Sequence, residues 1–191
     1  MIPWALLLPL AGALAALLLG RRWEATLGML TGLGNAAVAL TLAFEVWHAG
    51  AREHPIGGWA APLGIVLRID GLSAIMLLLT ALVALGVSGY AMVHLRRETT
   101  LRGPGGGEEL YWPLWLLLLT ALNGVFLSGD IFNLYVLLEL VSLAGIGLAA
   151  VAGKTEALGA SLRYLVATLV ASLFYLAGVA LLYANHHALD L

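Results

Sequence analysis

The feature that most constrains this chain is a series of six apolar runs, each long enough to cross a lipid bilayer as a helix. They lie near residues 2–20, 25–48, 71–94, 110–128, 131–152 and 162–184. Hydrocarbon cannot hydrogen-bond exposed backbone groups, so such runs form helices or a closed barrel. The alternating pattern of barrel strands is absent. The sequence therefore predicts an all-α integral membrane protein with about six transmembrane helices, forming one transmembrane domain over residues 1–191.

The composition excludes several other classes of protein. Charged residues make up 10% of the chain, against about 25% in soluble domains, which excludes a soluble enzyme, a nucleic-acid binder and a disordered chain. The absence of cysteine removes disulfides and thiolate metal sites. No Walker, dinucleotide, zinc-helix or nucleophile-elbow motif is present. We therefore expect no enzyme activity, cofactor or metal in this chain, and the chemistry that remains is movement of protons or ions.

The positive residues predict the orientation of the helices. Arg52 and Arg68 follow the second run, whereas the other seven of the nine follow the first, third and fifth runs: Arg21, Arg22, Arg96, Arg97, Arg102, Lys154 and Arg163. The positive-inside rule makes the larger group cytoplasmic, so both termini are expected outside. No positive residue precedes the first run, which we expect to be a retained helix and not a cleaved signal peptide. We expect a multi-pass protein of the cell inner or plasma membrane.

The outer segment 49–70 and two aspartates carry local signals. The segment contains two adjacent glycines followed by a β-branched run from Ile65 to Ile69, which predicts a short extended or hairpin element. Asp70 and Asp130 stand just before the third and fifth runs, where a carboxylate complements the helix dipole. Both are expected to cap helices. For Asp130, capping is compatible with a place at an ion entrance.

Glu139 is the one charged residue deep within a run. It follows Asp130 by nine residues, which places it about 13 Å into a hydrocarbon core of roughly 30 Å. Tyr135 and Ser142 share its helical face. A charge at the bilayer centre costs about 2.5–3.5 kcal/mol, and such carboxyls often belong to ion or proton routes. We interpret Glu139 as a proton relay; the alternative is a structural carboxyl that locks two helices together.

Two further polar patterns lie near the depth of Glu139. Asn123 reaches a similar depth on the fourth run, on a face that the sequence leaves open. The sixth run carries a stripe of hydroxyls within about 100° of one another on a helical wheel: Ser161, Tyr164, Thr168, Ser172, Tyr175 and Tyr183. Small hydroxyl residues are common where membrane helices pack. The stripe is therefore either a packing face or the hydrated, proton-conducting wall of a path that faces Glu139.

Three stretches resemble a known family, the antiporter-like membrane subunits. They are Gly58–Ile65, Ile69–Ala74 and, most specifically, Ser128–Val136 leading to Glu139. The chain is most similar to the D subunit of Mrp-type multisubunit sodium/proton antiporters, and next to subunits of respiratory complex I and membrane-bound hydrogenases. The resemblance runs along all 191 residues and corresponds to the first six of about fourteen spans. It implies the same outward N-terminus.

The resemblance also implies roles for particular residues. The family's fifth-span glutamate, part of its proton-translocation machinery, maps onto Glu139. Its usual partner is a lysine on the seventh span, which has no counterpart in this sequence. The chain also has Leu137-Leu138 where the family often has aromatic residues, and Thr168 where it often has an amide. Because no cation of the chain matches the depth of Glu139, we expect the isolated chain to hold this carboxyl uncharged at pH 7.

Three functions remain open from the sequence. The first is a subunit of a cation/proton antiporter or a related ion-pumping complex, whose partners are other membrane subunits, one of which supplies the missing lysine-bearing helices. Its cargo would be the proton, with sodium as a second candidate, and any redox chemistry would lie on other chains. The second is a non-conducting structural or assembly subunit, a truncated paralogue. The third is an independent small transporter, which the absence of a repeat partner disfavours.

Overall fold

The computed structural model of the chain describes all residues except 59–63, 103–109, 152–154 and 187–191. The described part forms six α-helices and a two-stranded sheet: α1 (Trp4–Leu19), α2 (Arg21–Ala49), β1 (Arg52–Pro55), β2 (Val66–Ile69), α3 (Gly71–Arg102), α4 (Tyr111–Leu127), α5 (Ile131–Ala150) and α6 (Thr155–His186), with a 3-10 turn η1 (Ile56–Gly58) after β1. Every predicted run corresponds to one helix, which confirms the all-helical class.

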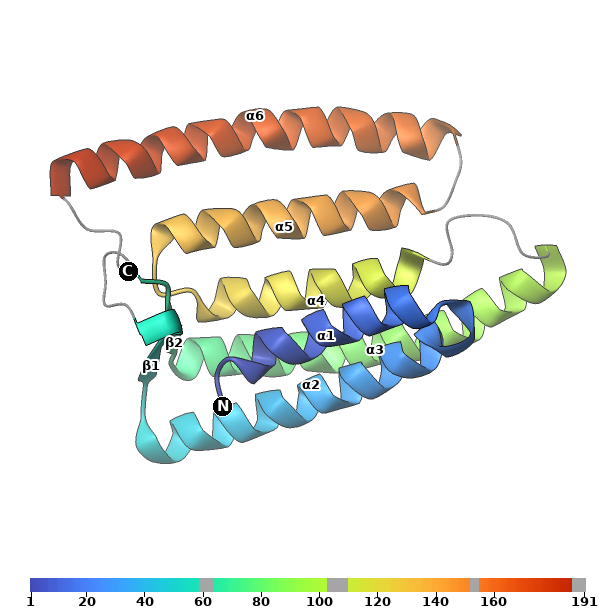
Figure 1. Ribbon diagram of the computed structural model, residues 1–191, viewed down its shortest axis with the longest axis horizontal. Helices are drawn as coiled ribbons and strands as arrows, with labels where there is room; N and C mark the ends of the chain where they lie inside the picture. Colours follow the sequence, from blue (N-terminus) through green and yellow to red (C-terminus); the bar gives the residue numbers. More distant parts are fainter. Residues whose placement is uncertain (59–63, 103–109, 152–154, 187–191) are drawn as a thin grey trace.

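The helices lie side by side in an ordered stack (Figure 1). α6 stands at one edge and packs mainly against α5, α5 packs against α4, and α4 packs against α1. On the far side of the bundle α2 packs against α1, and α3 packs mainly against α2 and also contacts α4. The start of α1, the β1–β2 hairpin and the α4–α5 turn gather at one end, which we call the hairpin end.

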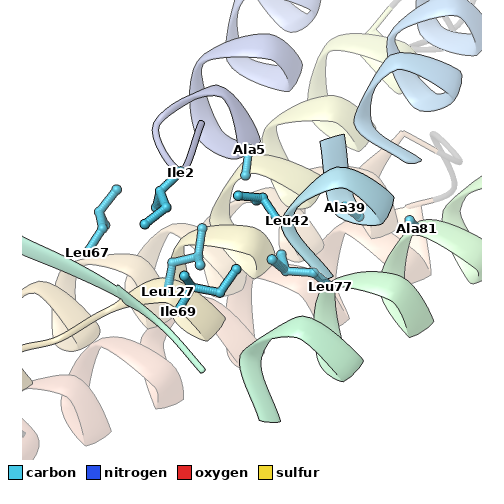
Figure 2. Close-up of a cluster of buried hydrophobic side chains, with 9 residues drawn as sticks. All are labelled: Ile2, Ala5, Ala39, Leu42, Leu67, Ile69, Leu77, Ala81 and Leu127. Atoms are coloured by element: carbon cyan, nitrogen blue, oxygen red, sulfur yellow. The ribbon is translucent and has the colours of Figure 1, made fainter. Parts of the chain in front are cut away.

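The core sits near the hairpin end, where α1, α2, α3, α4 and β2 converge (Figure 2). Its buried side chains are Ile2, Ala5, Ala39, Leu42, Leu67, Ile69, Leu77, Ala81 and Leu127. Two of them, Leu67 and Ile69, come from β2, so the hairpin contributes to the core and is not a loose loop. The side chains of α6 are largely exposed, in contrast to those of α4.

Within the described residues, four helices are long and apolar enough to span a membrane: Arg22–Ala49, Gly71–His94, Ile131–Ala150 and Thr155–Asn185. The two shorter apolar helices, α1 and α4, have 16 and 17 residues. At 1.5 Å per residue they measure about 24 to 26 Å, slightly less than a hydrocarbon core of about 30 Å. The protein is thus a multi-pass membrane protein with four long apolar spans. The crossing of α1 and α4 remains a prediction.

The predicted hairpin is confirmed, and it is fastened to the rest of the fold. β1 and β2 pair antiparallel, from Arg52 opposite Ile69 to Pro55 opposite Val66. The N–H of Gly129 in the α4–α5 turn donates to the carbonyl oxygen of Val66 over 2.9 Å. A Cβ at position 129 would lie 2.7 Å from that same oxygen, so this close approach of two backbones requires glycine.

Candidate functional site

A groove of about 210 Å³ between α5 and α6 gathers most of the predicted site residues. α5 contributes Tyr135, Leu138, Glu139 and Ser142, and α6 contributes Thr168, Ala171, Ser172 and Tyr175. The hydroxyl stripe of α6 therefore faces Glu139 along part of its length. This pairing of faces follows from the packing of α5 against α6, which the sequence alone does not specify.

Glu139 is partly buried in this groove. Within the described part of the chain, no hydrogen bond or ion pair satisfies its carboxylate. Arg163, the cation that precedes the groove on α6, lies with its guanidinium beside Gly159, toward the start of the helix and away from Glu139.

The three small hydroxyl residues of the groove share one hydrogen-bond arrangement. Ser142, Thr168 and Ser172 each donate to a carbonyl of their own helix three or four residues earlier, over 2.9 to 3.1 Å. Their protons are therefore occupied, and the oxygen lone pairs remain as acceptors. The groove wall around Glu139 can thus accept hydrogen bonds from water or from a protonated carboxyl.

Two tyrosines close the groove toward the hairpin end. The rings of Tyr135 and Tyr175 stack, with centroids 5.8 Å apart and planes 18° apart. The Tyr175 hydroxyl donates to the carbonyl of Ile131 over 3.3 Å, which is long for a bond between two oxygens. The Tyr175 hydroxyl is therefore level with the first turn of α5, and its ring lies beside Tyr135, one helical turn from Glu139.

Both predicted aspartate caps are confirmed. Oδ1 of Asp130 accepts a hydrogen bond from the backbone N–H of Asn133, and Oδ1 of Asp70 accepts from the N–H of Ser73 over 2.9 Å. The Ser73 N–H bond is the main cause that holds the pKa of Asp70 below its usual value, with a further bond from the Ser73 hydroxyl. Oδ2 of Asp130 is buried and has no partner within the described residues.

Asn123 lies apart from the groove, although its predicted depth matches that of Glu139. Its side chain is fully buried between α1, α2 and α4, where Nδ2 donates to the carbonyl of Ala5 over 2.7 Å and to Oδ1 of Asn35 over 2.8 Å. The Ala5 carbonyl is available because Pro9, four residues later, has no N–H to donate. Two signals in the sequence could have revealed this cluster. One is Pro9 inside the apolar helix α1, and the other is the single asparagine in each of α2 and α4.

The rest of the hydroxyl stripe divides between other surroundings. Tyr164 and Ser161 line a second groove of about 370 Å³, nearer the start of α6, together with small apolar residues such as Gly145, Ala149 and Ala157. Tyr164 is 58% exposed, whereas Ser161 is buried. The stripe is thus not one continuous wall. The described residues contain no cluster of three or more His, Cys, Asp or Glu that could hold a metal ion.

The region around this groove matches a known family. A family profile described as NADH:quinone oxidoreductase/Mrp antiporter, TM matches residues 128–191. The D subunit of a probable K(+)/H(+) antiporter from Rhizobium meliloti is 33% identical over 97% of this chain and 34% of its own length. The D subunit of the Na(+)/H(+) antiporter from Alkalihalophilus pseudofirmus is 32% identical over 80% of this chain and 29% of its own. The N subunit of the NADH-quinone oxidoreductase from Desulforudis audaxviator is 36% identical over 97% of this chain and 36% of its own length.

Solved structures share the fold. A chain of the archaeal membrane-bound sulfane sulfur reductase is 28% identical with a TM-score of 0.83, over 99% of this chain and 38% of that one. A chain of the Mrp complex from Dietzia is 27% identical with a TM-score of 0.82, over 99% of this chain and 35% of that one. The chain therefore spans about a third of the length of its relatives. It belongs to the family of antiporter-like membrane subunits that Mrp antiporters share with complex I.

Proposed function

We propose that the chain is a membrane subunit of a multisubunit cation/proton antiporter or a related ion-pumping complex. It contributes part of a proton or sodium pathway, in which Glu139 is the intramembrane relay. The observation that carries this proposal is the groove that places Glu139 opposite Thr168 and Ser172, with no fixed partner for the carboxylate in the described residues. The family match begins at Ser128 and covers both helices that form the groove.

In this proposal Glu139 accepts a proton from water in the groove and later releases it. The oxygens of Ser142, Thr168 and Ser172 orient that water, because their own protons are already bound to the helix backbone. A carboxylate in low dielectric needs a cation nearby. We place that cation, a lysine by the family resemblance, on a partner subunit, and the Mrp and sulfane sulfur reductase relatives come from multisubunit complexes.

The proposed orientation puts all six helices across the cell inner or plasma membrane with the hairpin end outside. Among the side chains that the structure describes, Arg52 and Arg68 lie in the hairpin, whereas Arg22 begins α2 at the opposite end. This distribution agrees with the excess of positive residues after the first, third and fifth runs.

A second candidate is a non-conducting structural subunit. The observation that favours it is that all three small hydroxyls of the groove bond to their own helices, as packing hydroxyls also do. The two functions differ in what Glu139 does, since a structural carboxyl has no part in ion movement.

The test replaces Glu139 in the native complex, reconstituted in proteoliposomes. Glu139→Gln keeps the size and hydrogen bonding of the side chain but cannot bind a transported proton. We expect ion-coupled proton movement to be lost while the complex still assembles, as judged by its purified subunit composition. Glu156→Gln, at an exposed site in the first turn of α6, is the matched control and should transport normally. Normal transport by Glu139→Gln would favour the structural function.

A further inference from the structure

Asp130 has a carboxylate oxygen that its capping role does not use. Oδ1 caps α5, whereas Oδ2 is buried without a partner in the described part of the chain. A buried, unpaired carboxylate oxygen is costly, and an asparagine or serine would cap the helix as well. The cap and the helix dipole account for a carboxylate at this position, but they give its second oxygen no hydrogen-bond partner.

Tyr175 brings a hydroxyl to the same turn as Asp130. This hydroxyl bonds to the carbonyl of Ile131, the residue next to Asp130, over a long distance of 3.3 Å, and the Asp130 carboxylate acts on it electrostatically. A phenol held by so long a bond can leave it for another acceptor on that turn, where Oδ2 of Asp130 has no partner among the described residues. The same ring stacks on Tyr135, and both rings line the groove that holds Glu139.

Toward the opposite end, the seam between α5 and α6 has a different character. The second groove is lined mainly by small apolar residues, with Ser161 and Tyr164 as its polar members. None of its lining residues is a carboxylate or a histidine. Among the described carboxyls of α5, α6 and their connecting turns, Glu156 stands at the opposite end, exposed and outside the lining of the second groove, whereas Asp130 stands at the hairpin end with a buried oxygen.

We propose that the Glu139 groove opens toward the hairpin end through Asp130, and that Tyr175, stacked on Tyr135, is the gate between the two carboxyls. This inference rests on the proposed function of Glu139. A proton moves from Oδ2 of protonated Asp130 to the Tyr175 oxygen, which gives its own proton to groove water, and that water protonates Glu139. One carboxyl loses the proton that the other gains, and the phenol is regenerated. The same steps run in reverse.

The groove has the space that this transfer needs. Glu139 lies one helical turn from Tyr135, on which the Tyr175 ring stacks, and all three side chains line the groove. A water molecule occupies about 30 Å³ in the liquid, and the groove of about 210 Å³ has room for several. The acceptor oxygens of Ser172 and Thr168 line the same groove.

The first test uses two conservative variants in the reconstituted complex. Tyr175→Phe removes the hydroxyl and keeps the ring stack, and Asp130→Asn keeps a side chain that can cap α5. Each should slow Glu139-dependent proton movement by at least about tenfold, the scale of a lost proton-transfer group. Tyr90→Phe, an exposed tyrosine of α3, and Asp70→Asn, the cap of α3, are the matched controls and should transport at the wild-type rate.

The outcomes separate this inference from the proposed function. If Glu139→Gln is inactive while Tyr175→Phe and Asp130→Asn are normal, the groove opens elsewhere and the relay role of Glu139 stands. If Glu139→Gln itself transports normally, the proposed function is wrong, and the inference that rests on it falls with it.

A second measurement does not depend on transport. The chain has no cysteine, so Ser172→Cys introduces a single thiol into the groove. A membrane-impermeant thiol reagent should modify this variant faster when added on the hairpin side than on the opposite side. Phe174→Cys is the control. Its side chain is 74% exposed but lies outside the groove lining, so in a membrane-spanning helix it faces lipid. A membrane-impermeant reagent does not enter lipid, so this variant should react slowly from both sides. Modification of Ser172→Cys from the opposite side alone, or from neither side, would overturn the proposed opening.

Discussion

At the scale of single residues, this chain uses side chains to satisfy backbone groups that its helices leave unpaired. Asp70 accepts from the N–H of Ser73 at the start of α3, and Asp130 does the same at the start of α5. Asn123 supplies a donor to the Ala5 carbonyl, which Pro9 leaves without its helical partner. Each contact replaces one missing backbone bond.

The cap formed by Asp70 should make stability depend on pH. Asp70→Ala should destabilise the protein by about 0.5–2 kcal/mol at pH 7. The pKa of Asp70 is lowered in the folded chain, so its contribution is present above the unfolded value of about 3.9 and is lost as the pH falls through the folded value. The gap between the unfolding midpoints of wild type and Asp70→Ala in mild detergent should therefore narrow at low pH. A gap that stays constant from pH 7 to pH 3 would contradict this account of the cap.

The contact of Asn123 can be tested against its proposed cause. Asn123→Ala leaves the Ala5 carbonyl and the Asn35 amide unpaired and should cost about 1–3 kcal/mol. Pro9→Ala restores an N–H for the same carbonyl, so the double variant should lose less than the sum of the two single changes. Unfolding in detergent measures the three values. Strict additivity would mean that Pro9 and Asn123 do not share the Ala5 carbonyl.

At the scale of elements, the hairpin and the α4–α5 turn form one junction at the hairpin end. β2 buries Leu67 and Ile69 in the core, and Val66 meets Gly129 backbone to backbone. This junction holds the turn that contains Asp130. The position of Asp130 therefore depends on a strand that lies more than 60 residues earlier in the chain.

Gly129→Ala tests this junction. Its Cβ would lie 2.7 Å from the Val66 oxygen, which forces the hairpin away from the turn and should cost about 1–3 kcal/mol. Hydrogen exchange of the β2 amides should quicken. Gly89→Ala, where a Cβ meets nothing within 4 Å, is the control and should leave exchange in β2 unchanged. Unaltered protection of β2 in Gly129→Ala would show that the close approach is not what fastens the hairpin.

The elements also show what the sequence can and cannot predict. The apolar runs located all six helices, because burial in lipid selects helices regardless of their partners. Hydropathy placed the end of α3 near residue 94, whereas the helix continues to Arg102, since no helix-breaking residue precedes Gly103. Both caps were predictable because capping is local. The Asn123 cluster was not, because its contact with Ala5 joins residues 118 positions apart.

At the scale of the whole molecule, the candidate site lies near the edge of the bundle and not at its centre. α5 and α6 form the last two layers of the stack in Figure 1, and the side chains of α6 are mostly exposed. The relatives are about three times as long as this chain. A groove at this edge, with a carboxyl that lacks a partner among the described residues, fits a site that helices outside residues 1–191 complete.

The central claim is that Glu139 changes its protonation state during transport. Infrared difference spectroscopy of the reconstituted complex measures this directly, through the carbonyl stretch of a protonated carboxyl when an ion gradient is imposed. We predict a difference band that is present in the wild type and in Glu156→Gln and is lost in Glu139→Gln. The same band in Glu139→Gln and the wild type would contradict the claim.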